Sequence, residues 1–484
     1  MRNEGRVIAS FDERKGIIRN QLLETGKRLQ AQVLIDEDLL QEVTALVEWP
    51  VAVDGHFDAA FLKVPSEALI SSMQGHQKFF PLLDAKQKLK PMFITIANIE
   101  SKDVAQVRAG NERVIRPRLA DAAFFWEQDQ KQTLEGLRDG LKTLVYQAKL
   151  GSLYDKSTRL SCLAGWLAKE IGLGDFTLAQ RAGLLSKSDL LTNMVCEFTE
   201  LQGTMGRYYA KANGEPDAVA VALDEQYQPR FSGDRLPQTP TGQALALAEK
   251  MDTLVGIFGI GMPPTGDKDP FALRRAALGI LRILIEQQLN LNLHRAIEEA
   301  IAQFQQPIKK EGLQKQIFSF LMDRLNAYYQ EREHQPDCID AVSAVQPSSP
   351  LDFHRRVVAV SQFRKRPEAE SLAQANKRIG NILRKAAIDD AALTIDANLL
   401  PEAAEKTLHL QLVNKGQAIA GLITTGQYQA ALEQLATFKL PIDDFFDQVM
   451  VMAEDKAVRM NRAALLQQLG GLMNQVADIS KLAA

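Results

Sequence analysis

The feature that most constrains this fold is the helical spacing of its apolar residues, which continues almost without a break from about Ala120 onward. One example is the series Leu141, Leu144, Val145, Ala148, Leu150 and Leu153. Apolar residues that recur every three or four positions line one face of a helix. Because 484 residues exceed the size of one ordinary core, the sequence predicts a mainly α, multidomain protein.

The early part of the chain has a different pattern and predicts an α+β unit. Its β-rich pieces are residues 51–53, 61–64 and 93–96. Residues 84–87 have turn composition, which predicts an antiparallel hairpin between residues 79–83 and 92–97. The charged stretch from Arg6 to Arg28 is predicted to be largely helical. Nothing precedes this helix for it to pack on, so we expect the beginning of the unit to be missing.

Composition argues against several classes of protein. No segment approaches about 18 uncharged apolar residues, so no membrane span is expected, and the start MRNEGR lacks the apolar run of a signal peptide, which predicts a cytoplasmic protein. The three cysteines lie too far apart for a zinc or redox pair. No histidine stands between His76 and His294, which weighs against a transition-metal hydrolase.

Basic residues are concentrated near the carboxy-terminal end, although the whole chain has a net charge of −3. Residues 354–385 contain nine basic and two acidic residues, a local charge of +7. Such a cluster predicts a salt-sensitive surface for polyanions, with a solvated helix face as the alternative. The residues that we expect to contact RNA are Lys377, Arg378, Arg384, Arg459 and Arg462.

A second arginine-rich stretch, residues 107–126, ends in three aromatic residues. Its basic residues are Arg108, Arg113, Arg116 and Arg118. Guanidinium groups suit phosphate oxygens, and aromatic rings offer stacking faces. RNA contact is therefore one interpretation of Arg113, Arg116 and Arg118, and a solvated helix is the other. For Phe124, Phe125 and Trp126 we expect packing in an interdomain core.

Residues 256–279 contain glycines that could suggest a phosphate loop, but no strand precedes them and no Gly-Lys-Ser/Thr ending follows.

Asp269 is suited to be an N-cap, with Pro270 as the first residue of a helix that runs to Leu289. Arg274 and Arg275 then lie near the positive end of that helix and need an anionic partner. We favour an internal ion pair with Asp267 or Asp269; a tRNA phosphate or another subunit is the alternative.

Several blocks together resemble one family. They include LVEWP, HQKFFPL, NERVIRPRLADAAFF, ALDEQYQPRFSGD, DKDPFALRRAALG, ANKRIGNIL and FFDQVMVMAEDKAVRMNRAALL, in this order. The chain is similar over nearly its whole length to the beta subunit of the bacterial two-subunit glycyl-tRNA synthetase. The resemblance covers the carboxy-terminal two-thirds of such a subunit, so the sequence is expected to be a fragment.

The resemblance implies a truncated α+β domain of the tRNA-editing type, a degenerate helical domain of the HD type and a helical body with an anticodon-binding domain. With linker composition at residues 346–350, these domains are expected at residues 1–125, 126–345 and 346–484. Of the HD-type metal ligands only Asp189 and Asp252 stand at plausible places, and Ser188 replaces a histidine. The middle domain is therefore expected to be a scaffold without phosphohydrolase activity.

The resemblance also implies a tRNA-binding ligase subunit without a complete active site. The alpha subunit would bind glycine, ATP and Mg²⁺ and make glycyl-adenylate, so no cofactor is expected on this chain. The expected partners are the alpha subunit, in an alpha2beta2 assembly, and tRNA-Gly. Two alternatives stay open: an active HD-type phosphohydrolase that uses Asp189, Asp252 and Glu249, and a stand-alone RNA-binding scaffold.

Overall fold

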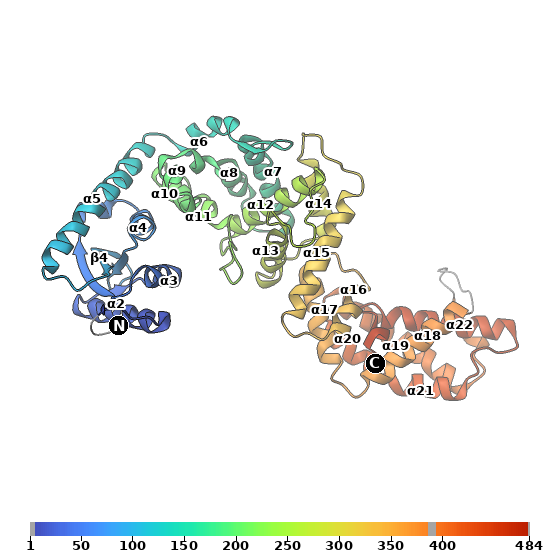
Figure 1. Cartoon of the computed structure of the whole chain (residues 1–484). Coiled ribbons are helices and arrows are strands. Elements are labelled where there is room, and N and C mark those ends of the chain that lie inside the picture. Colours follow the sequence, from blue (N-terminus) through green and yellow to red (C-terminus); the bar gives the residue numbers. More distant parts are fainter. Residues whose placement is uncertain (1–4, 386–393, 483–484) are drawn as a thin grey trace. The chain divides into compact units, whose positions relative to one another are not determined.

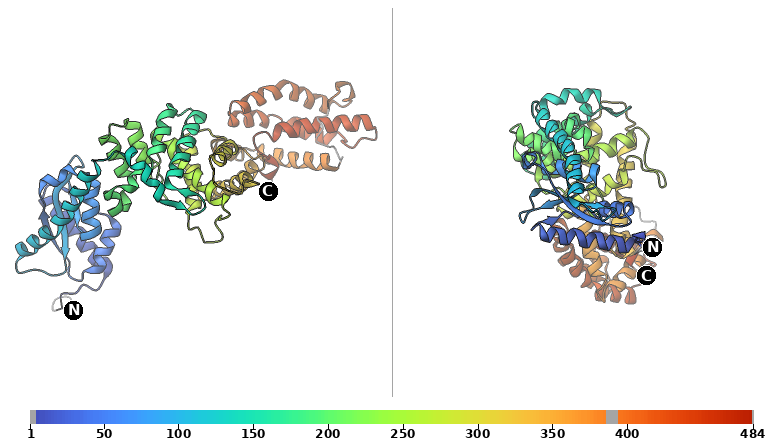
Figure 2. Two further views of the ribbon diagram at one scale, coloured as in Figure 1. Left: turned by 90° about the horizontal axis from the view of Figure 1, so that it is seen from above. Right: turned by 60° about the vertical axis from the view of Figure 1, so that its left-hand side comes forward.

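The computed structural model describes residues 5–385 and 394–482 of the chain (Figure 1). It divides into two compact units. Unit 1 comprises Met1–Gly165, Gly174–Gln228 and Pro237–Ala246, and unit 2 comprises Trp166–Leu173, Pro229–Leu236 and Leu247–Ala484. Helices dominate both units, which confirms the mainly α, multidomain prediction (Figure 2). No helix of the described ranges is long and apolar enough to cross a membrane.

Unit 1 contains a four-stranded antiparallel sheet in the order β1-β3-β4-β2. The strands are β1 (Gln32–Val33), β2 (Val51–His56), β3 (Phe80–Leu83) and β4 (Leu89–Ala97). Phe80 pairs with Ile94 and Leu83 with Leu89 across the predicted hairpin. The Asp84 carboxylate accepts the backbone N–H groups of Lys86 and Lys88, each within 2.9 Å, and so fixes the turn. The hairpin prediction is confirmed.

Helices α2 (Phe11–Arg28) and α3 (Glu37–Leu46) pack on this sheet. The Ser10 hydroxyl caps the first turn of α2, and the Asp36 carboxylate caps that of α3. Ile18 and Leu22 of α2 meet Phe80 and Ile94 of the sheet in one buried cluster. The helix predicted between Arg6 and Arg28 is therefore confirmed and has an apolar face to bury.

Two local predictions are wrong. Residues 61–64 do not form a strand but lie mostly in the 3-10 helix η1 (Ala59–Lys63), because the Asp58 carboxylate accepts the Ala60 N–H at 2.8 Å and caps that turn. Residues 144–152, which have helical spacing, include a short hairpin of β5 (Val145–Gln147) and β6 (Gly151–Ser152). Gly151 adopts a φ of 84°, which allows the chain to turn there.

Helices form the remainder of unit 1. They are α4 (Ser66–Ser71), η2 (Ser72–His76), α5 (Val104–Asp129), α6 (Leu134–Leu137), η3 (Arg138–Thr143), α8 (Phe176–Leu185), η4 (Ser188–Leu191), α9 (Asn193–Glu197), η5 (Thr199–Leu201), α10 (Thr204–Ala212) and α11 (Asp217–Glu225). The buried Asp129 carboxylate joins three of them, since it accepts the Asn193 N–H at 2.9 Å and the Tyr209 hydroxyl at 2.8 Å. Helices α7 (Leu153–Ile171) and α12 (Pro240–Gly259) contribute residues to both units.

Unit 2 is a helical array. Its helices are α13 (Leu273–Glu286), α14 (Leu293–Ala302), α15 (Leu313–Gln330), α16 (Pro336–Ser343), α17 (Pro350–Phe363), α18 (Ala369–Lys385), η6 (Ala397–Leu399), α19 (Ala403–Thr424), α20 (Tyr428–Ala436), α21 (Lys439–Gln448), α22 (Lys456–Met473) and η7 (Ile479–Leu482). One buried cluster extends from Leu281 and Leu325 to Leu465 and Ile479, so the core continues across residues 346–350. The predicted domain divisions at 125/126 and 345/346 do not coincide with the two units and stay predictions.

Candidate nucleic-acid interface

Helix α18 separates an apolar face from a basic one. It buries Leu372, Ala373 and Ile379 in the core of unit 2. Its exposed side carries four cations that form two pairs, and the members of each pair are seven residues apart and so lie on one face of the helix. This basic face of α18 consists of Lys377, Arg378, Arg384 and Lys385.

The nine basic residues of the +7 stretch do not all remain available. Three are bound to carboxylates: Arg356 to Asp352 at 2.8 Å, Arg364 to Asp337 at 2.7 Å and Arg366 to Glu368 at 3.3 Å. The other six are exposed and have no carboxylate partner among the described residues; they are Arg355, Lys365 and the four residues of the basic face of α18. The stretch thus retains a surface for an external anion.

Arg378 is held in place by its neighbour on α21. Its guanidinium carbon lies 4.2 Å from the centroid of the Phe446 ring. A cation over an aromatic face is attracted by the ring while its N–H groups stay free for hydrogen bonds. Arg384 and Lys385 lie in the last turn of α18, where positive charge is favourable. The basic face is therefore compatible with a stable helix before any ligand binds.

The structure corrects the prediction for Arg462. This residue lies in α22, and its side chain is only 6% exposed. Its Nε donates to Glu405 at 2.8 Å, Nη2 donates to the other carboxylate oxygen at 3.2 Å, and Nη1 donates to the Met450 carbonyl at 2.8 Å. Arg459 is half-buried and donates to the Ala453 carbonyl at 3.0 Å. Arg462 is thus occupied inside the fold and does not present itself to RNA, whereas Arg459 remains partly accessible.

In unit 1, the predicted arginines lie on α5. Ile115, Leu119 and Ala122 form its buried side, and Arg113 and Arg116 are exposed one turn apart. Arg118 is exposed as well, and none of the three has a carboxylate partner in the described part of the chain. Their contact with RNA stays a prediction.

Two other side chains of this region have structural roles. Arg108 pairs with the buried Asp54 at 3.0 Å, and Trp126 stacks on Tyr209 of α10, with ring centroids 5.3 Å apart. Phe124 is 56% exposed, however, so the expectation that all three aromatics pack in a core is wrong for this residue. It stands on an outward position of α5.

The residues at the HD-type positions are buried. Ser188 and Asp189 begin η4 in unit 1, and they are 0% and 2% exposed. The Asp189 carboxylate accepts the Gly203 N–H at 2.6 Å, and burial raises the pKa of this carboxyl to about 6. Asp252 lies in α12 and is 1% exposed. In the described ranges, no three His, Cys, Asp or Glu side chains gather as a metal site requires.

Asp189→Asn should remove a pH-dependent part of the stability. In the fold, the pKa of this carboxyl is about 6, above its ordinary value of 3.8. The protonated carboxyl therefore stabilises the fold fully below pH 3.8, and this stabilisation is lost as the pH rises through about 6. From about pH 4 to about pH 7.5, the variant should gain about 1–3 kcal/mol relative to the original chain. Urea unfolding at both pH values measures this difference. A difference that is independent of pH would contradict the assignment.

Asp269 caps α13 from a position different from the predicted one. The helix begins at Leu273, after a turn in which Ala272 has a φ of 52°. The Asp269 carboxylate accepts the N–H groups of Leu273 at 2.8 Å and Arg274 at 2.9 Å. It therefore still accepts hydrogen bonds from the free N–H groups at the start of the helix, although Pro270 lies outside the helix.

The predicted ion pair of Arg274 or Arg275 with Asp267 or Asp269 is not formed. In the described ranges, the two guanidinium groups donate instead to backbone carbonyls, those of Gly266 and Arg230. Within the part of the chain that the structure describes, no carboxylate therefore offsets the charge of either arginine.

Comparison with known proteins decides the family. A family model described as the glycyl-tRNA synthetase beta subunit matches residues 1–344. The chain belongs to this family. A second model, the DALR anticodon binding domain, matches residues 372–482. The basic face of α18 lies within the range of this second match.

Individual members of the beta subunit family are similar over nearly all of this chain. The glycine–tRNA ligase beta subunit of Ectopseudomonas mendocina (strain ymp) is 53% identical over 476 residues. Those of Edwardsiella ictaluri (strain 93-146) and Marinobacter nauticus are each 51% identical, over 478 and 483 residues. The matches cover 98%, 99% and 100% of this chain and 69% of each relative. The chain thus spans about two-thirds of the length of these beta subunits.

The sequence interpretation missed one group of arginines. Arg282, Arg324 and Arg332 line a pocket together with Arg274 and Arg275. Arg275 and Arg282 are seven residues apart, which is a signal that they share one face of a helix. Arg324 of α15 has no such signal in the sequence, because only the packing of α15 against α13 brings it to this place.

Proposed function

We propose that this chain is the tRNA-binding part of a glycine–tRNA ligase. It would hold tRNA-Gly while an alpha subunit binds glycine, ATP and Mg²⁺ and makes glycyl-adenylate. The complete reaction converts ATP, glycine and tRNA-Gly into glycyl-tRNA, AMP and diphosphate. The assembly would be an alpha2beta2 heterotetramer in the cytoplasm, with no cofactor on this chain.

The observation that carries this proposal is the basic face of α18. Its four cations are exposed and meet no carboxylate among the described residues, and they lie in the range that matches an anticodon-binding domain. The basic side chains of such a surface would neutralise phosphate groups of RNA and so release the counterions that surround them. An RNA held there would reach the adenylate in one orientation, so the chain would contribute to rate through positioning.

Charging of tRNA-Gly by the alpha subunit, with and without this chain, tests the proposal. We expect glycyl-tRNA to form only when both are present, because the alpha subunit alone would not hold the tRNA. Pyrophosphate exchange by the alpha subunit should proceed in both cases, since adenylate formation would not use this chain. Equal charging without the chain would refute its role. Metal-dependent phosphatase turnover by the chain alone would favour the phosphohydrolase alternative instead.

A further inference from the structure

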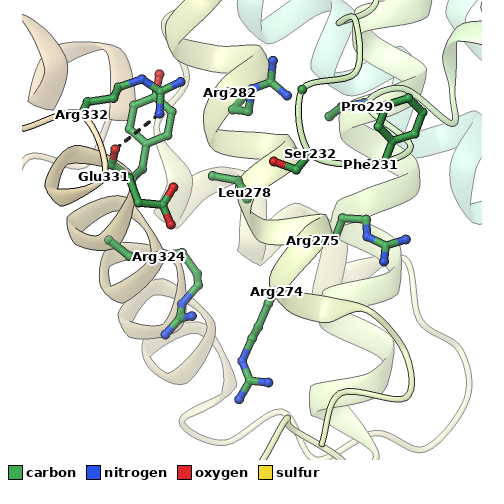
Figure 3. Close-up of a pocket in the computed structure, with 14 residues that line it drawn as sticks. Pro229, Phe231, Ser232, Arg274, Arg275, Leu278, Arg282, Arg324, Glu331 and Arg332 are labelled. Atoms are coloured by element: carbon green, nitrogen blue, oxygen red, sulfur yellow. Dashed lines mark hydrogen bonds between the residues drawn. The ribbon is translucent and has the colours of Figure 1, made fainter. Parts of the chain in front are cut away.

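Unit 2 contains an arginine-lined pocket of about 600 Å³ (Figure 3). Its walls come from α13, from α15 with the residues that follow it, and from the loop of residues 229–233. Five of its lining residues are the arginines Arg274, Arg275, Arg282, Arg324 and Arg332. Figure 3 shows Arg324 on one helix, with Glu331 and Arg332 at its end, and Arg274, Arg275 and Arg282 on the facing helix, with the Arg275 guanidinium turned away from the first helix.

Acidic partners offset only part of this charge. Glu286 serves two arginines, because its Oε1 lies 3.0 Å from Arg282 Nε and 3.5 Å from Arg332 Nη2. Arg274, Arg275 and Arg324 have no carboxylate partner among the described residues. With Glu286 and Glu331 against five arginines, the pocket carries a net charge of about +3 at neutral pH.

One of these arginines also has an unused donor. The Nε of Arg324 is buried, and it meets no hydrogen-bond acceptor in the described structure. A buried N–H without an acceptor costs free energy, and like charges in one concavity repel one another. An anion that enters the pocket relieves the repulsion between these charges. Planar guanidinium groups match phosphate oxygens with paired N–H donors, so phosphate is the anion that this arrangement suits best.

We propose that this pocket binds the phosphate of a nucleotide, either free or at the end of an RNA chain. Its volume lies in the range of about 300–1,000 Å³ that is usual for small-molecule sites, which leaves room for a nucleoside next to the phosphate. Phe231, 63% exposed, adds an aromatic side chain to the lining on which a base can stack. The site is separate from the basic face of α18 and does not depend on the function proposed for it.

Calorimetric titration of the whole chain with AMP and with inorganic pyrophosphate tests the site. We expect saturable binding of both, weakened at least about tenfold in Arg274→Gln/Arg275→Gln because two charge-assisted contacts are lost. Lys309→Gln/Lys310→Gln removes the same charge from exposed positions of unit 2 outside the pocket, and it should change affinity less than about twofold. Arg324→Gln, which alters a different wall, should weaken binding in the same way. Absence of saturable binding, or equal affinities in all variants, would overturn the proposal.

The source of the phosphate follows from a second titration, with tRNA-Gly that carries either a 5′-phosphate or a 5′-hydroxyl. If the pocket holds an RNA end, dephosphorylation should weaken binding about tenfold in the original chain and leave Arg274→Gln/Arg275→Gln unchanged. If the 5′-phosphate has no effect while AMP binding depends on these arginines, the ligand is a free nucleotide. If replacement of the arginines changes the affinity for neither ligand, the site does not exist, whatever the basic face of α18 binds.

Discussion

Replacement of Arg462 by alanine should lower the free energy of unfolding of unit 2 by about 3–5 kcal/mol. The change removes a bidentate ion pair with Glu405, which is 0% exposed, and a hydrogen bond to the Met450 carbonyl. The Glu405 carboxylate would remain buried without its cation, and that uncompensated charge is the main cost. Urea unfolding followed by circular dichroism measures the loss.

Two control variants separate the ion pair from a general effect of truncation. Arg459→Ala removes an arginine from the same helix that is only half-buried and bonds one carbonyl, so it should cost no more than about 1 kcal/mol. Arg462→Met combined with Glu405→Gln removes both charges but keeps an acceptor for the Glu402 N–H at the start of α19, and it should restore part of the lost stability. If Arg462→Ala unfolded at the same urea concentration as the original chain, the buried pair would have no such role.

Reversal of two charges on the basic face, Arg378→Glu with Arg384→Glu, should weaken tRNA-Gly binding by about a hundredfold at moderate salt. Each lost phosphate contact reduces the salt slope of the affinity by about one. The slope of log K against log salt should therefore become shallower by about two. Fluorescence anisotropy of labelled tRNA-Gly over a series of salt concentrations gives both quantities.

The matched control is Lys309→Glu with Lys310→Glu, which makes the same change of net charge at exposed positions of unit 2 away from α18. It should change the affinity less than about threefold, because distant exposed charges are screened within about 10 Å. The assignment of the basic face fails if both double variants bind equally, or if the reversal on α18 leaves the salt slope unchanged.

Sequence patterns predicted those parts of the fold that local chemistry determines. The hairpin of β3 and β4 has its turn signal and both apolar strands within 20 residues, so no distant contact is needed. Residues 144–152 were predicted wrongly because their apolar spacing suits both a helix and a short hairpin, and Gly151 decides between them. For residues 61–64, the cap at Asp58 prevailed over strand propensity.

Prediction of the candidate site succeeded only in part, because the sequence shows charge but not burial. Arg459 and Arg462 are three positions apart in one helix, yet only Arg462 meets Glu405, a residue 57 positions away. Likewise, the carboxylates nearest in sequence to Arg274 do not pair with it, since Asp269 is used as a cap. Such outcomes depend on tertiary packing, which the spacing of residues along one helix cannot reveal.

We expect tRNA-Gly to lie on the basic face of α18. A photoreactive amino acid introduced at position 377, with a second chain labelled at the exposed position 315 of α15 as control, tests this contact directly. We predict that illumination with tRNA-Gly crosslinks RNA to position 377 and not to position 315. Equal crosslinking at both positions, or none at position 377 under conditions in which the chain binds tRNA-Gly, would show that the RNA does not lie on this face.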